Sequence, residues 1–311
     1  MTSSPAPIAL FAFKRAQHTQ RALEALAGNA EWQQSPLFIY CDGARQPGEQ
    51  AAVEQTRAVV RAFAHPHKVI IEAPSNQGLA ASIRSGVTAL CERFGRVVVV
   101  EDDLIVSPVF LSYMNQALER YQADARVMQI SGHMFPVDLA GYGSAVLLPF
   151  TTTWGWATWQ RAWVGSLPQP TEAVQCLAQY GWRHRFDING AYPYARMLVD
   201  QMRGRKDSWG IWWYFHVFRN GGLTLYPTRT LVQNEGFDGS GTHCGTWRQA
   251  TDGELGKSAA FAWPAVAETS GATAVLRAHL LRSRGMARLV KDRWKRAFPG
   301  LPAAAHSGTT A

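Results

Sequence analysis

Three consecutive carboxylates, Glu101, Asp102 and Asp103, directly follow a run of four valines at residues 97–100. An apolar run without alternation predicts a strand buried on both faces, as in a parallel sheet. Ligands of open α/β sheets bind at the carboxyl ends of such strands, so we expect these acids to face a binding crevice. Adjacent like charges need a counter-charge, and oxygen ligands suit Mn²⁺ or Mg²⁺. The alternative interpretation is a solvated acidic turn.

Two more polar side chains follow predicted strands and should lie at the same edge of the sheet. Arg15 comes after a strand predicted at residues 8–13, and Asp42 comes after one at 37–41. A guanidinium can hold a diphosphate, and a carboxylate can accept a hydrogen bond from a base N–H. These residues together predict a nucleotide site.

The phosphate-binding motifs of two large enzyme classes are missing. No GxGxxG follows the first predicted strand and no GxxxxGK[ST] occurs anywhere, which argues against a dinucleotide dehydrogenase and a P-loop enzyme. Phosphates would therefore be held by metal and arginine. The turn at residues 75–78, which contains Asn76, opens the next helix and could contact the nucleotide, although a capping turn explains it equally well.

Two later segments carry groups suited to catalysis. Asp207 precedes a cluster of aromatic residues, and partial burial there would suit it to abstract a proton, unless it merely caps the following helix. The glycine-rich run at residues 236–243 suits a lid, and His243 is a candidate metal ligand, although a lone histidine is more often structural. The candidates for aromatic side chains that face a sugar are Trp154, Trp156, Trp209 and Trp212.

The elements that must position these residues alternate between strand and helix. Apolar runs predict strands at residues 8–13, 37–41, 69–71, 97–100 and 127–130. Helical spacing is clear at residues 79–94, before Gly95, and again from Pro108 to about Tyr121. This alternation predicts an α/β fold with a mainly parallel sheet and right-handed crossovers.

Composition narrows the class of protein. The 311 residues are 47% hydrophobic, no apolar stretch is long enough to span a membrane and no secretion signal is present, so we expect a cytoplasmic protein. The four cysteines are far apart and form no CxxC pair, which predicts free thiols rather than a zinc site or disulfides.

The net charge of +8 is concentrated near the C-terminus. Between residues 274 and 298, eight lysines and arginines face one aspartate, and apolar residues recur at helical spacing. Such a basic amphipathic helix can lie on the inner face of a membrane as a peripheral contact, or simply pack on its own domain. Aromatic residues are too sparse there to suggest nucleic-acid binding.

The combined pattern resembles A-type-fold glycosyltransferases, in particular the inverting β-1,2-N-acetylglucosaminyltransferase family and bacterial family-two-like sugar transferases. The resemblance covers about residues 7–245. It rests on residues 8–15, VVVVEDDL at 97–104, TWGWATWQRAW at 153–163, residues 206–209 and GFDGSGTHC at 236–244.

The resemblance implies a role for each candidate. Asp103 would be the direct metal ligand, with Asp102 and Glu101 contacting the nucleotide-sugar, and Asp207 would be the catalytic base. Arg15 and Asp42 match positions that hold phosphate and uracil. The Asn76 turn is similar to the helix opening of the broader family, but Ser85 replaces the asparagine that commonly precedes the position of Gly86.

The domain organisation that follows has three parts. Residues 1–245 form the catalytic domain, with a Rossmann-like nucleotide-sugar-binding half at 7–135 and an acceptor half at 136–245. Residues 246–298 form a linker and the basic helix, and residues 299–311 a disordered tail.

We therefore expect a metal-dependent inverting glycosyltransferase. It would move a sugar, with N-acetylglucosamine as a candidate, from a UDP-linked donor to a glycan or glycolipid acceptor in bacterial surface polysaccharide or lipopolysaccharide synthesis. The family's eukaryotic members are membrane-anchored in the lumen, and because this chain has no anchor a Golgi glycoprotein acceptor is not expected. The alternatives are a sugar nucleotidyltransferase, whose usual glycine-rich loop is missing after the first strand, and a non-catalytic carbohydrate-binding protein.

Overall fold

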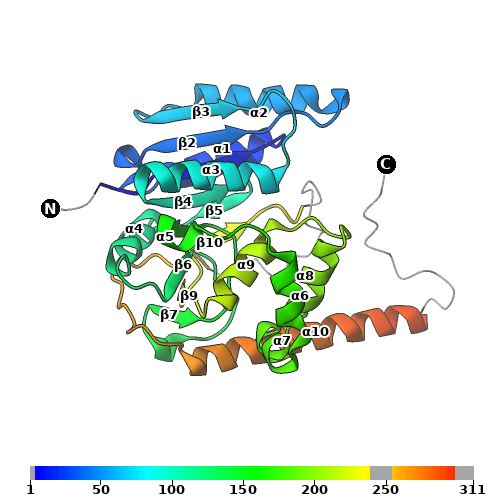
Figure 1. Cartoon of the computed structure of the whole chain (residues 1–311). Coiled ribbons are helices and arrows are strands. Elements are labelled where there is room, and N and C mark those ends of the chain that lie inside the picture. The colour runs from blue at the N-terminus through cyan, green and yellow to red at the C-terminus, as the bar shows by residue number, and fades with distance from the viewer. Residues whose placement is uncertain (1–3, 239–253, 298–311) are drawn as a thin grey trace.

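The computed structural model describes residues 4–238 and 254–297, with side chains of the last helix described as far as Ser283. Its centre is an eight-stranded sheet in the order β3-β2-β1-β4-β8-β6-β9-β7 (Figure 1). In that order the strands are Lys68–Glu72, Leu37–Cys41, Ile8–Ala12, Arg96–Glu101, Trp156–Trp159, Val127–Ser131, Leu223–Pro227 and Ala145–Leu148.

Six of these strands run in one direction, while β8 and β7 run in the opposite direction. A second, two-stranded sheet pairs β5 (Leu104–Val106) with β10 (Val232–Asn234) in antiparallel fashion. The predicted α/β fold with a mainly parallel central sheet is therefore confirmed.

The helices lie on both faces of the central sheet and around its second half. They are α1 (Ala16–Ala27), α2 (Gln50–Ala62), α3 (Leu79–Phe94), α4 (Phe110–Arg120), α5 (Gln160–Trp163), α6 (Pro170–Ala178), α7 (Tyr180–Phe186), α8 (Tyr194–Met202), α9 (Trp209–Arg219) and α10 (Ser270–Ala297). Short 3₁₀ turns, η1 (Trp32–Gln34), η2 (Pro47–Glu49) and η3 (Ala140–Tyr142), complete the described elements.

The four valines of β4 are fully buried because both faces of the strand are covered. Val98 and Val100 belong to a core cluster that includes residues of α1 and α4. Val97 and Val99 point to the other face, where they join a cluster that includes residues of α3. This two-sided burial explains the lack of alternation in the sequence. The predicted helix at 79–94 is also confirmed, and it ends at Gly95, whose φ of +74° favours glycine.

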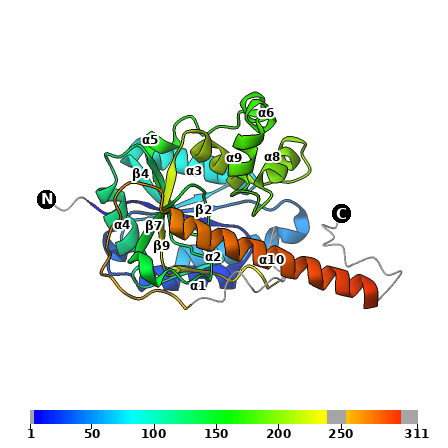
Figure 2. The same ribbon diagram turned by 90° about the horizontal axis from the view of Figure 1, so that it is seen from below.

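The segment after residue 254 packs against the body of the protein. The Phe261 and Trp263 rings lie 5.1 and 5.5 Å from the Tyr113 ring of α4, between ring centroids. In α10, Leu276 and Leu280 are buried in a core cluster, so one face of this helix packs on the domain. Figure 2 shows the far end of α10 extending beyond the neighbouring elements. Within the described part of the chain, no helix combines the length and apolar character that crossing a bilayer requires.

Candidate active site

The acidic turn lies where β4 ends, at the carboxyl edge of the parallel strands. The backbone N–H of Asp102 donates to the Phe11 carbonyl of β1 at 3.0 Å, which fixes the turn beside the end of the neighbouring strand. The side chains of Asp102 and Asp103 are buried. The interpretation of these residues as a solvated turn is therefore wrong.

Arg15 provides a cation for two of these acids. It stands directly before α1, and its Nη2 donates to Oδ1 of Asp102 and, at 3.0 Å, to Oδ2 of Asp103. Burial alone would lower the pKa of Arg15, but the two adjacent carboxylates outweigh it and raise this pKa above its ordinary value. The structure thus brings Arg15 and the acidic turn into direct contact.

The single guanidinium of Arg15 does not offset the burial of three adjacent acidic side chains. Burial, together with the charges of Asp103 and Asp102, raises the pKa of Glu101 to about 8, and Arg15 offsets only part of this. Burial also raises the pKa of Asp102. The turn therefore has an excess of negative potential that a further cation would relieve.

The donor atoms fit a divalent cation that is shared with a ligand. Asp103 Oδ1 is buried and accepts no hydrogen bond from residues 4–238 or 254–297. Within those same residues no group of three or more His, Cys, Asp or Glu side chains is arranged to hold a metal. Mg²⁺-type sites commonly use one or two carboxylates and complete their shell with phosphates and water. Asp103 suits such a site, and the other predicted ligand, His243, lies outside the described residues.

Asp42 and Asn76 are also brought together, at the end of β2. The Asp42 carboxylate accepts the N–H groups of Gly43, Gln77 and Gly78 at 2.8, 2.7 and 3.0 Å, and the Asn76 side-chain amide at 2.9 Å. These four bonds occupy the acceptor sites of a carboxylate. Asp42 therefore organises the turn before α3, and a base N–H would have to share one of its oxygens. Its contact with a base stays a prediction.

Ser85, which stands where the broader family commonly has asparagine, makes a hydrogen bond within its own helix α3. The Ser85 hydroxyl donates to the Ser82 carbonyl at 3.1 Å. The next residue, Gly86, needs to be glycine because a Cβ there would lie 2.9 Å from the Phe11 and Tyr40 rings. This close approach seats α3 against the ends of β1 and β2.

The aromatic candidates divide into core and partly exposed residues. Trp156 is 0% exposed and its ring lies 5.5 and 5.6 Å from those of Trp209 and Trp213. A role for Trp156 at a sugar is therefore wrong, because these rings fill the core under the site. Trp212 is also buried, whereas Trp154 and Trp209 keep some exposed surface.

Asp207 lies in the loop between α8 and α9. It is exposed, so the partial burial that we expected among its aromatic neighbours is wrong. Ser208 is the N-cap of α9 and makes no side-chain capping bond. The start of α9 lies near the same edge of the sheet as the acidic turn, because Trp209 packs on Trp156, which pairs with Val99 of β4.

The segment after β10 covers the acidic turn. The glycine-rich run suggested a lid, but the sequence did not indicate a contact with Asp103. The N–H of Glu235 donates to the Asp103 carbonyl at 2.9 Å. A Cβ at Gly236 would clash with Asp103 Oδ2, so the absence of a side chain favours this close approach of the backbone to the carboxylate. The Phe237 ring contacts Trp154 at 5.6 Å between centroids. Residues 236–238 therefore form one wall of the candidate site. The residues that follow, 239–253, lie outside the described part of the chain.

Comparisons with known proteins give only structural likenesses of low identity and low TM-score. No protein-family model and no curated protein sequence matches this chain. Among solved structures, a mannosyltransferase from Pyrobaculum calidifontis in complex with GDP-Man and Mn²⁺ aligns over 70% of this chain and 71% of its own, at 12% identity and a TM-score of 0.37. A structure of GalNAc-T7 with UDP, GalNAc and Mn²⁺ aligns over 72% of this chain, at 6% identity and a TM-score of 0.42. The aligned part is 43% of the GalNAc-T7 chain.

Proposed function

We propose that this protein is a metal-dependent glycosyltransferase of the A-type fold, which moves a sugar from a nucleotide-sugar to an acceptor hydroxyl. The observation that supports this proposal is the surroundings of the two carboxylate oxygens of Asp103. One of its carboxylate oxygens bonds to Arg15, and the other is buried with no hydrogen bond from the described residues, at the carboxyl edge of a mainly parallel sheet. This arrangement suits a diphosphate held by a divalent cation and an arginine.

The reaction assigns a separate task to each group of residues. Asp103 would hold Mn²⁺ or Mg²⁺, which when bound stabilises the negative charge of the leaving diphosphate. Arg15 adds a fixed positive charge beside it. The Asp42 and Asn76 turn faces the nucleoside, and Glu101 and Asp102 face the donor sugar. Asp207 takes the proton from the acceptor hydroxyl as that oxygen attacks the anomeric carbon, with inversion.

The first experiment is a donor panel with purified full-length protein. We expect one nucleotide-sugar to bind and turn over with Mn²⁺, and to be inert after chelation. UDP-N-acetylglucosamine is our first candidate, and UDP-N-acetylgalactosamine and GDP-mannose belong in the panel. Release of pyrophosphate from a nucleoside triphosphate and a sugar phosphate would instead indicate a nucleotidyltransferase. Sugar binding without any donor turnover would indicate a non-catalytic binding protein.

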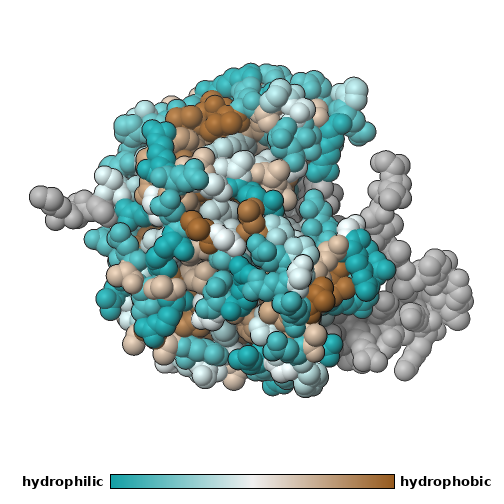
Figure 3. Space-filling model, in the orientation of Figure 1, coloured by the Kyte–Doolittle hydropathy of each residue, from teal (hydrophilic) through white to brown (hydrophobic). Residues whose placement is uncertain are grey.

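We further propose that the acceptor is a glycan or glycolipid of a bacterial surface polysaccharide, reached at the cytoplasmic face of a membrane. Residues 1–135 contain twelve basic and twelve acidic residues, so the net charge of +8 belongs entirely to residues 136–311. In α10, buried Leu276 and Leu280 anchor the helix while Arg277 and Arg282 are exposed. Figure 3 shows that one face of the molecule is mostly hydrophilic, with separate apolar patches. We propose that α10 contacts the membrane through the attraction of its basic residues to anionic lipid.

Vesicle binding tests this contact. A chain truncated after Ser283 retains Leu276 and Leu280 but loses six basic residues and one acidic residue of α10. Each basic residue near an anionic surface contributes about 1 kcal/mol, so we expect binding to phosphatidylserine vesicles to fall by several orders of magnitude at low salt. Neutral phosphatidylcholine vesicles are the control. Equal binding of the full-length and truncated chains to anionic vesicles would contradict the proposal.

A further inference from the structure

We infer that His18 and Arg21 are positioning residues for Asp103. They act through the segment at residues 235–238, which we name the cover segment. The inference rests on the proposed function for the role of Asp103 as a metal ligand. It goes beyond that function because neither residue belongs to the donor site itself.

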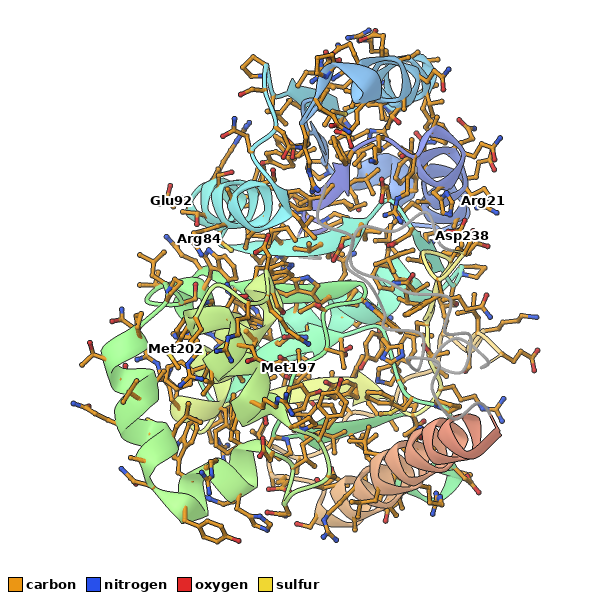
Figure 4. The ribbon with its side chains drawn as sticks, turned by 90° about the vertical axis from the view of Figure 1, so that its right-hand side faces the viewer. Arg21, Arg84, Glu92, Met197, Met202 and Asp238 are labelled. Atoms are coloured by element: carbon orange, nitrogen blue, oxygen red, sulfur yellow. The ribbon has the colours of Figure 1, made fainter. Side chains whose placement is uncertain are left out.

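Three basic or titratable side chains, Arg15, His18 and Arg21, lie in the first turns of α1 and at its N-cap. They are spaced three residues apart, so each is a neighbour of the next along the surface of the helix. His18 and Arg21 each lie close to an acidic side chain of the cover segment. His18 Nε2 lies 3.2 Å from Asp238 Oδ2, and Arg21 Nη2 lies 3.0 Å from Glu235 Oε2. Figure 4 shows Arg21 and Asp238 close together on one side of the molecule.

The cover segment in turn limits where the Asp103 side chain can lie. Its Glu235 N–H is bonded to the Asp103 carbonyl, and the Gly236 backbone lies against Asp103 Oδ2. Asn234 reinforces this position, since its side-chain oxygen accepts the Gly236 N–H at 2.7 Å. On the other side, Arg15 bonds to the same Oδ2 atom. Asp103 is thus confined between Arg15 and a segment that α1 holds in place.

The Arg21 and Glu235 ion pair is a poor candidate for a purely structural role. The Arg21 and Glu235 side chains are 47% and 38% exposed, and exposed pairs contribute little to global stability. Residues that orient a metal ligand have a different effect. Their loss typically lowers metal affinity or activity by roughly 10- to 100-fold without unfolding the protein.

A charge exchange tests the inference. We expect Arg21→Glu and Glu235→Arg each to weaken binding of Mn²⁺ alone by about tenfold, and the double variant to recover most of that loss. Donor turnover should fall mainly through kcat, with little change in the thermal midpoint. Amide hydrogen exchange at Glu235 should quicken in the single variants and slow again in the double variant.

Arg120→Glu is the matched control, with the same charge change. Arg120 lies in the last turn of α4, which leads to the opposite edge of the sheet, so all readouts should stay at wild-type values. If Arg21→Glu behaves like Arg120→Glu, or if the double variant recovers nothing, the inference is wrong. If wild-type protein binds no Mn²⁺, the proposed function fails instead. Unchanged exchange at Glu235 in Arg21→Glu would then overturn the inference independently.

Discussion

Replacing Asp103 by Asn should leave the protein folded and reduce metal-dependent transfer by about 10³-fold or more. The substitution keeps the shape of the side chain and removes the negative charge that would bind the cation. A catalytic metal supplies several kcal/mol of transition-state stabilisation, and each 1.36 kcal/mol corresponds to about tenfold in rate. The measurement is initial transfer rate against Mn²⁺ concentration, together with Mn²⁺ binding to the protein alone.

Asp124→Asn is a suitable control because Asp124 bonds to Arg126 at the far end of α4. It should transfer sugar at the wild-type rate. An Asp103→Asn protein that keeps its Mn²⁺ affinity and its rate would remove Asp103 from the metal site. The proposed function would then lose the observation on which it depends.

Asp207→Asn should abolish transfer while leaving the donor bound. General-base catalysis contributes roughly 10²- to 10⁴-fold, so we expect a loss of kcat in that range with an unchanged donor Kd. Because Asp207 is exposed, the substitution should not disturb the fold. Transfer kinetics and calorimetric donor binding on the same preparation separate the two effects.

The control for this experiment is Asp200→Asn on the neighbouring helix α8. Asp200 lies 3.8 and 3.9 Å from the side chains of Arg196 and Arg205, so it is an acid of the same region with partners of its own. It should retain transfer. If Asp207→Asn loses donor binding as well as transfer, its role is structural rather than catalytic.

The sequence predicted the first half of the fold well because its strands are buried on both faces. Runs such as residues 97–100 have no alternation, and this feature is specific to central strands of a parallel sheet. The reversed strand β8 was missed, and one of its two tryptophans, Trp156, was interpreted as a sugar-facing side chain. Two of its four residues are tryptophan, and neither periodicity nor composition distinguishes a short aromatic core strand from an aromatic loop.

The candidate site was predictable where each residue directly follows a strand. Arg15 and the acids of the turn meet because parallel strands end at one edge. The contact between Gly236 and Asp103 was not predictable, since it joins positions more than a hundred residues apart through backbone proximity. The three-residue spacing of Arg15, His18 and Arg21 is visible in the sequence. Their acidic partners, Asp238 and Glu235, become apparent only in the folded chain.

The bond from Arg15 to both acids has a practical consequence. Many metalloproteins unfold when stripped of their ion, because the free energy of metal binding is part of their free energy of folding. Here Arg15 pairs with Asp102 and Asp103 and offsets part of their repulsion without any metal, so we expect the turn to keep its structure when the ion is removed. Removing the metal should therefore abolish transfer activity without unfolding the protein. Activity should return when the ion is added back to the same sample.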